Sequence, residues 1–176
     1  MLQILHKSDF PKVYALMEES FPREEYRSYE DQLALWEREE YQVYGETDSR
    51  GRLWGFLAVW ELSGYLFIEH FAVCGTERNR GLGSRLLAEL QERYSCPLCL
   101  EVEVPVDSLT CRRVGFYERN GFTLNPFPYE QPSLGEGRDP VPLKIMTTAA
   151  PLTEEAFAEL QTLLYSKVYG KEGKDG

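Results

Sequence analysis

Residues 67–90 read FIEHFAVCGTERNRGLGSRLLAEL, an apolar run followed by a basic, glycine-containing turn and a second apolar run. This order predicts a strand, a turn and a helix that begins near Gly83. Backbone N–H groups at a helix N-terminus lack intrahelical partners and carry the positive end of the helix dipole, and glycine lets an anion approach the main chain. The turn from Arg78 to Ser84 is therefore predicted to hold a phosphate or pyrophosphate group.

The spacing of the glycines disfavours two common nucleotide sites. A P-loop places lysine and Ser/Thr directly after a second glycine that lies five residues after the first. Here Gly81 and Gly83 are two apart, and Ser84 and Arg85 follow. A dinucleotide fingerprint has its third glycine where this chain has Leu86. A glycine turn that only joins a strand to a helix is the alternative that remains at this point.

A second motif follows further along the chain, where residues 112–122 read RRVGFYERNGF. Together the two motifs resemble the GNAT N-acetyltransferase superfamily. Its coenzyme turn has the pattern Arg/Gln-x-x-Gly-x-Gly/Ala, matched by Arg78, Gly81 and Gly83, and a later helix ends in Phe-Tyr-x-x-x-Gly-Phe, matched by residues 116–122. The resemblance covers about residues 53–146, and the N-terminal helices more loosely.

The resemblance implies an acyltransferase that uses acetyl-CoA as co-substrate and moves the acetyl group to a primary amine of a small molecule by direct attack in a ternary complex. The turn would hold the pyrophosphate, and the main chain of the preceding strand would bond the pantetheine. The residues expected to bind the coenzyme are Phe71, Ala72, Val73, Arg78, Asn79, Arg80, Gly81, Leu82, Gly83 and Ser84. Because the chain is acidic overall, the coenzyme needs local positive charge, which we expect from Arg78, Arg80 and Arg85.

Catalysis requires a base that removes a proton from the amine and an acid that protonates the departing thiolate. Tyr117 stands at the superfamily's tyrosine position and is the expected acid. Glu69 and Glu103 are the preferred candidates for the base, and Glu101 is a weaker one, because all three interrupt apolar strands where burial would raise a carboxyl pKa. Strand alternation places Glu101 and Glu103 on one face, and it places His70 opposite Glu69, where a structural histidine is expected.

One position departs from the family pattern. Many relatives carry an asparagine that touches the coenzyme seven residues before the tyrosine, and this chain has Thr110 there. The shorter hydroxyl is expected to substitute only weakly for the amide.

The composition of the chain limits its size class, its possible partners and its cellular location. The chain has 176 residues, 43% of them hydrophobic, which suffices for one core, and its net charge of −10 disfavours nucleic acid and anionic membranes as partners. The sequence has neither a long apolar run nor a signal-peptide pattern, so a cytoplasmic enzyme is expected. Cys96 and Cys99 have the spacing of metal ligands, but further close-set ligands are lacking, so no metal is expected and the thiols are expected to be free.

The hydrophobic pattern alternates between helices and strands and predicts an α/β fold, a mixed sheet with helices on both faces. The resemblance adds that the sheet is mostly antiparallel, with a splayed parallel strand pair at its centre. Helices are expected at 8–20, 28–39, 83–94, 110–119 and 154–168, and strands at 41–46, 53–62, 65–73, 98–104, from 122, and at 141–147. A single domain, 1–176, would comprise N-terminal helices and a first strand (1–52), an acetyl-CoA core (53–124) and a C-terminal loop, strand and helix (125–176), with 171–176 frayed.

The identity of the acceptor is the property that the sequence determines least. In the family it binds between the first helices and a late hairpin, here 21–27 and 125–132, whose acidic and aromatic residues suit a cationic amine or are simply solvated loops. Two alternatives to a small-molecule enzyme stay open. One is a protein or peptide N-terminal acetyltransferase, and the other is a non-catalytic acyl-CoA-binding regulator whose last helix, 156–165, covers a homodimer surface.

Overall fold

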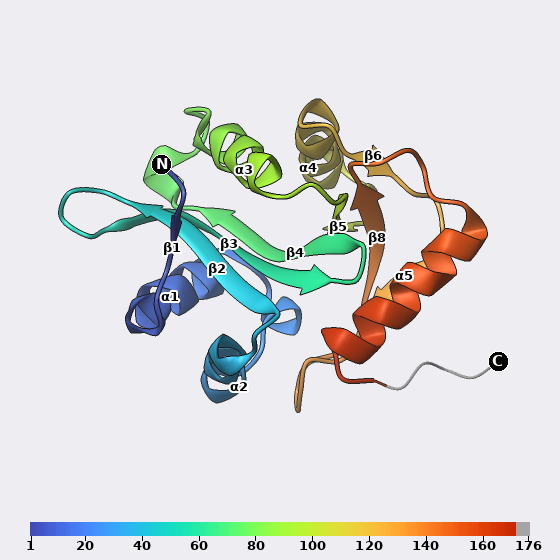
Figure 1. Cartoon of the computed structure of the whole chain (residues 1–176), viewed down its shortest axis with the longest axis horizontal. Helices are drawn as coiled ribbons and strands as arrows, with labels where there is room; N and C mark the ends of the chain where they lie inside the picture. Colours follow the sequence, from blue (N-terminus) through green and yellow to red (C-terminus); the bar gives the residue numbers. More distant parts are fainter. Residues whose placement is uncertain (172–176) are drawn as a thin grey trace.

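A computed structural model describes residues 1–171, so the predicted fraying beyond Lys171 lies outside the described residues. The chain forms one mixed sheet in the order β1-β2-β3-β4-β5-β8-β6, with β7 paired to β8 (Figure 1). The strands are β1 (Gln3–Ile4), β2 (Tyr41–Thr47), β3 (Leu53–Leu62), β4 (Tyr65–Val73), β5 (Leu98–Glu103), β6 (Thr123–Leu124), β7 (Tyr129–Gln131) and β8 (Val141–Thr147). Among the strands of the described residues, only β4 and β5 pair in parallel.

Helices cover both faces of this sheet, as Figure 1 shows. One face packs under α1 (Phe10–Ser20), α2 (Tyr29–Ala34) and α5 (Glu154–Lys167), the other under α3 (Leu82–Arg93) and α4 (Ser108–Arg119). Short 3₁₀ turns lie at η1 (Lys7–Asp9), η2 (Arg23–Glu25), η3 (Leu35–Glu37) and η4 (Gly75–Glu77). Among the described residues, no helix is both long and apolar enough to cross a bilayer. The predicted α/β fold is confirmed.

The parallel pair separates after three residues. Leu66–Ile68 pair with Leu98–Leu100, and beyond that point β4 continues along β3 while β5 continues along β8. The facing edges of β4 and β5 therefore lose each other's hydrogen bonds from residues 69 and 101 onward. This splay opens the centre of the sheet, and it confirms the expected splayed pair.

A β-bulge in β4 corrects one expectation. His70 pairs with Ala58 and Ile68 pairs with Val59, so Glu69 is an extra residue in the ladder. An extra residue breaks the two-residue alternation of side chains. Glu69 and His70 therefore both reach the face covered by α1, whereas strict alternation had placed them on opposite faces.

Three elements and one surface differ from the sequence prediction. The strands β1 and β7 were not predicted, and the expected helix at 28–39 is a short α-helix that continues as the 3₁₀ turn η3. The apolar side of α5 is buried against its own chain, since Phe157 stacks on Phe127 with ring centroids 4.9 Å apart and Leu164 is fully buried. That side of α5 is therefore not available to cover a dimer surface.

Candidate functional site

A cleft of about 930 Å³ lies where β4 and β5 separate. Its walls come from residues 71–73 of β4, residues 101–103 of β5, the loop before α3, and one side of α4. Residues 19–25, at the end of α1 and in η2, close the remaining side. The cleft thus connects the basic turn on one side of the sheet to strand carboxylates on the other.

The turn before α3 has the backbone expected of an anion site. Asn79 and Gly81 adopt left-handed conformations with φ of 63° and 78°, and no side chain caps the first N–H groups of α3. Alternating right- and left-handed residues turn successive N–H groups toward a common point. Arg78 also lies on this wall, where its Nε donates to the Val73 carbonyl at 3.3 Å. These features fit a pyrophosphate group.

Some of the residues predicted to form this turn line the cleft, and others do not. Those that line the cleft are Arg78, Asn79, Gly81, Gly83 and Ser84. Arg80 is exposed, 3.9 Å from Glu77, and Leu82 is buried in the core beneath the turn, so neither lines the cleft.

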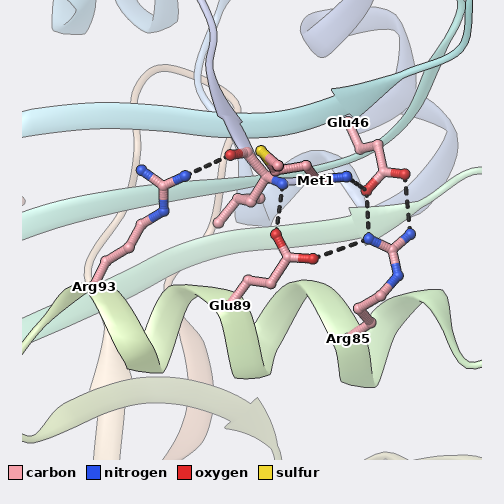
Figure 2. Close-up of polar contacts among 6 residues, drawn as sticks. Met1, Glu46, Arg85, Glu89 and Arg93 are labelled. Atoms are coloured by element: carbon pink, nitrogen blue, oxygen red, sulfur yellow. Dashed lines mark hydrogen bonds and ion pairs between the residues drawn. The ribbon is translucent and has the colours of Figure 1, made fainter.

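Arg85 is a correction to the expected source of positive charge. Its guanidinium makes two hydrogen bonds to Glu46 of β2, at 2.7 and 3.0 Å, and one to Glu89 at 3.0 Å (Figure 2). The same Glu89 accepts the Leu2 backbone N–H at 2.6 Å. Arg85 therefore ties α3 to β1 and β2. Glu89 four residues later was a signal for this pairing, because residues i and i+4 share a helix face.

The last residues of β4 present to the cleft a main-chain edge that no strand covers, on which Arg78 Nε donates to the Val73 carbonyl. Phe71, Ala72 and Val73 pair with β3 on one side, but β5 has already diverged on the other. Backbone donors and acceptors on that side can pair with an extended ligand in the manner of an added strand.

Tyr117 lies on α4 and lines the cleft. Its ring packs among Phe71, Phe116 and Phe122, with centroids 5.2 to 6.5 Å away. Burial raises the pKa of Tyr117 to about 12, although Arg113 opposes the shift. The phenol therefore carries its proton at neutral pH.

Glu69 is placed away from the cleft wall. Its carboxylate forms an ion pair with Arg27 at 2.9 Å, with side chains 3% and 9% exposed, and accepts the Trp60 Nε1–H at 2.9 Å. Burial raises the pKa of Glu69, but Arg27, His70 and these hydrogen bonds outweigh burial and hold the pKa below its ordinary value. The arrangement is that of a structural carboxylate.

The two carboxylates of β5 do line the cleft, on the same face as predicted. Glu103 is partly exposed and ion-paired with Arg113. Glu101 is half-buried and has no paired cation among the described residues, and its Oε1 accepts the Tyr169 hydroxyl at 2.5 Å. Burial raises the pKa of Glu101 to about 7, while the phenols of Tyr129 and Tyr169 act in the opposite direction.

The other oxygen of Glu101 faces a second phenol. This atom, Oε2, is buried beside the Tyr129 hydroxyl, and neither of the two makes a hydrogen bond of ordinary geometry among the described residues. A carboxyl group with a pKa near neutrality that lines a cleft can take a proton from a ligand. Sequence reasoning ranked Glu101 below Glu69 because no local signal shows which carboxylate lacks a cation.

Three further placements complete the site. Glu25 of η2 lines the cleft, and burial raises its pKa. His70 is buried with Nε2 2.6 Å from the Glu25 carbonyl oxygen, and burial lowers its pKa, so the imidazole is neutral and supports η2. Thr110 uses its hydroxyl to cap α4 together with Asp107 and does not line the cleft.

Comparison with known proteins adds family evidence. The model of the acetyltransferase (GNAT) family matches residues 10–122. A GNAT-family protein of Bacteroides thetaiotaomicron has the same fold with a TM-score of 0.86 and 34% identity, covering 98% of this chain and 99% of that one. YjbC of Bacillus subtilis, classed by name among the acetyltransferases, is 32% identical over 112 residues, which span 62% of this chain and 55% of YjbC.

More distant structures share the fold alone. A ribosomal-protein-S18-alanine N-acetyltransferase from Escherichia coli superposes with a TM-score of 0.60 at 22% identity, covering 88% of this chain and 96% of that one. A chimera of the spermidine N-acetyltransferase SpeG, from Vibrio cholerae and hSSAT, gives a TM-score of 0.63 at 16% identity, covering 84% and 94%. These two proteins act on different acceptors, so the fold does not select one.

Proposed function

The chain belongs to the GNAT acetyltransferase family, and from this premise we propose that it transfers an acetyl group from acetyl-CoA to a primary amine of a small, positively charged molecule. The observation that carries the proposal is the cleft itself. It joins a turn suited to an anion to Glu101, a carboxyl group whose pKa lies near neutrality.

The coenzyme supplies the acetyl group as an activated thioester. In the proposal, the N–H groups around Gly81 and Gly83 and the charge of Arg78 hold its pyrophosphate. The uncovered edge of residues 71–73 holds the pantetheine through backbone hydrogen bonds. The fit is supported by the left-handed backbone at Asn79 and Gly81 and by the start of α3, which no side chain caps.

Two side chains divide the proton transfers. Glu101 accepts a proton from the acceptor's ammonium group, because its pKa of about 7 leaves a large carboxylate fraction at neutral pH. The neutral amine then attacks the thioester carbonyl and the C–S bond breaks. Tyr117, still protonated, donates its proton to the departing sulfur, and the second proton that the nitrogen loses as the amide forms restores the phenol.

The carboxyl groups on one side of the cleft favour a cationic acceptor, whereas Arg112, Arg113 and Arg119 of α4 lie on another wall. Beside Glu101, the side formed by α1 and η2 contributes Glu19 and Glu25, while Glu103 is already paired with Arg113. The unpaired carboxyl groups would attract a second positive charge on the acceptor. Diamines, polyamines and aminoglycosides have this chemistry, whereas acidic acceptors would be disfavoured.

The test is thiol release from acetyl-CoA with a panel of polyamines, amino acids, aminoglycosides and short peptides. We expect turnover with a multiply charged amine. Glu101→Gln should lower kcat by about 100- to 10,000-fold and Tyr117→Phe by about 10- to 1,000-fold. Glu103→Gln, from the same strand, is the matched control and should retain most of the activity.

Different failures of this test have different meanings. Coenzyme binding without turnover on any amine would support the regulator alternative. Turnover only with peptides would support the N-terminal acetyltransferase alternative. Wild-type turnover in both Glu101→Gln and Tyr117→Phe would overturn the assigned proton transfers.

A further inference from the structure

The segment that follows α5 reaches Glu101, one of the residues that line the cleft. Tyr169 lies 68 residues from Glu101 and outside the region 10–122 that the family model matches, yet its hydroxyl is 2.5 Å from Glu101 Oε1. This carboxyl group is thus held by a side chain from the C-terminal segment, which the two family motifs do not include.

Several contacts fix the position of Tyr169. The backbone N–H groups of Val168 and Tyr169 both donate to the Leu164 carbonyl, at 2.9 and 3.2 Å, and end the helix. The buried Arg27 donates to the Val168 carbonyl at 3.3 Å, and its guanidinium carbon lies 6.0 Å from the centre of the Tyr169 ring. Because both the backbone and the ring are held, the phenol has a defined direction toward Glu101.

We propose that Tyr169 is a positioning residue that holds Oε1 of Glu101 and keeps the carboxylate oriented and ionised, so that it can take a proton from the acceptor amine. This inference rests on the proposed function, in which Glu101 is the base. It assigns to the C-terminal segment a part in the reaction.

The groups around Glu101 come from several elements. Tyr169 follows α5, Tyr129 lies on β7, Glu69 on β4, and Glu25 on η2. Burial raises the pKa of Glu101, both glutamates raise it further, and the two phenols lower it. A hydroxyl that donates to a carboxylate stabilises the charged form. Without the Tyr169 hydroxyl, a smaller fraction of Glu101 would be ionised at neutral pH.

The test is the pH profile of kcat/KM for Tyr169→Phe, which keeps the ring and removes only the hydroxyl. Loss of a hydrogen bond to a charged group should move the midpoint of the rising limb upward by about one pH unit. Activity should fall about tenfold on the acidic side of the limb and approach the wild-type value on the basic side. Tyr165→Phe is the control, because its hydroxyl donates to the Glu130 carbonyl at 2.5 Å and should leave the limb unmoved.

A second readout does not depend on turnover. Carbon NMR of carboxyl-labelled glutamate, with the Glu101 signal assigned by its absence in Glu101→Gln, should show the same upward shift of the Glu101 titration in Tyr169→Phe. An unmoved limb and an unmoved titration, with Glu101→Gln inactive, would overturn this inference alone. Full activity in Glu101→Gln would overturn the proposed base and this inference with it.

Discussion

Two glutamates on neighbouring strands differ in charge because only one of them has a cation. Glu69 pairs with Arg27, which outweighs the cost of burial and keeps the carboxylate ionised. Glu101 has phenols and two further carboxyl groups near it but no cation, so burial dominates and its pKa rises to about 7. The neighbours of each carboxyl group, rather than the residue type, decide which one can exchange protons at neutral pH.

This difference predicts a pH dependence of stability for Glu101→Gln. The folded pKa of Glu101, about 7, lies above its ordinary value of 4.5, so its contribution to stability is complete below pH 4.5 and is lost as the pH rises to about 7. The glutamine variant lacks this loss. The Tm of Glu101→Gln relative to wild type should therefore rise between pH 4.5 and 7 and level off above.

Thermal unfolding followed by circular dichroism across this range measures the effect. Glu103→Gln is the control, since that carboxylate is partly exposed and ion-paired. Parallel Tm curves for Glu101→Gln and wild type would show that Glu101 is not protonated in the folded protein.

The sequence predicted part of the site, because some site residues lie in local motifs while others meet only through tertiary packing. Tyr117 and Gly83 lie within short motifs, so their place on the cleft followed from local pattern. The choice among the carboxylates depended on Arg27 and Tyr169, which tertiary packing brings to the strands. The bulge at Glu69 also has no local signature, and it moved His70 to the other face.

At the scale of elements, two arginines near the start of α3 have different roles. Arg78, in the turn before the helix, lines the cleft, whereas Arg85, within its first two turns, binds Glu46. Substituting each tests this division. Arg78→Ala should weaken the Kd for coenzyme A by roughly tenfold, because it removes a charge from the phosphate site. Arg85→Ala should leave the Kd unchanged and lower the Tm.

Isothermal titration calorimetry with coenzyme A and thermal unfolding together measure both effects. An equal loss of affinity in the two variants would contradict the division, since it would place Arg85 in the phosphate site.

Element boundaries were predictable where a segment is long and its pattern regular. The strands at 53–62, 65–73 and 141–147 were predicted with the bounds observed. The missed strands β1 and β7 have two and three residues, which is too short for alternation to be visible. β7 also lies in a segment rich in proline and glycine, and its pairing with β8 becomes evident only in the folded sheet.

Across the whole molecule, Arg27 links parts that are distant in sequence. It follows η2, pairs with Glu69 of β4 and donates to the carbonyl of Val168 after α5. Its own carbonyl accepts the Tyr14 hydroxyl at 2.9 Å. One buried cation therefore joins the N-terminal helices, the sheet and the C-terminal segment that carries Tyr169.

The last prediction concerns this ion pair. Glu69→Ala leaves Arg27 buried without a partner, so the free energy of unfolding should fall by roughly 3–5 kcal/mol. The double variant Arg27→Met/Glu69→Leu replaces the pair with apolar side chains and should recover most of that loss. Urea unfolding of both variants and of wild type measures the difference. At a temperature where each variant is folded, the double variant should keep measurable kcat, because Glu101 rather than Glu69 is the proposed base. A well-folded double variant whose kcat falls as far as that of Glu101→Gln would instead place Glu69 in the reaction.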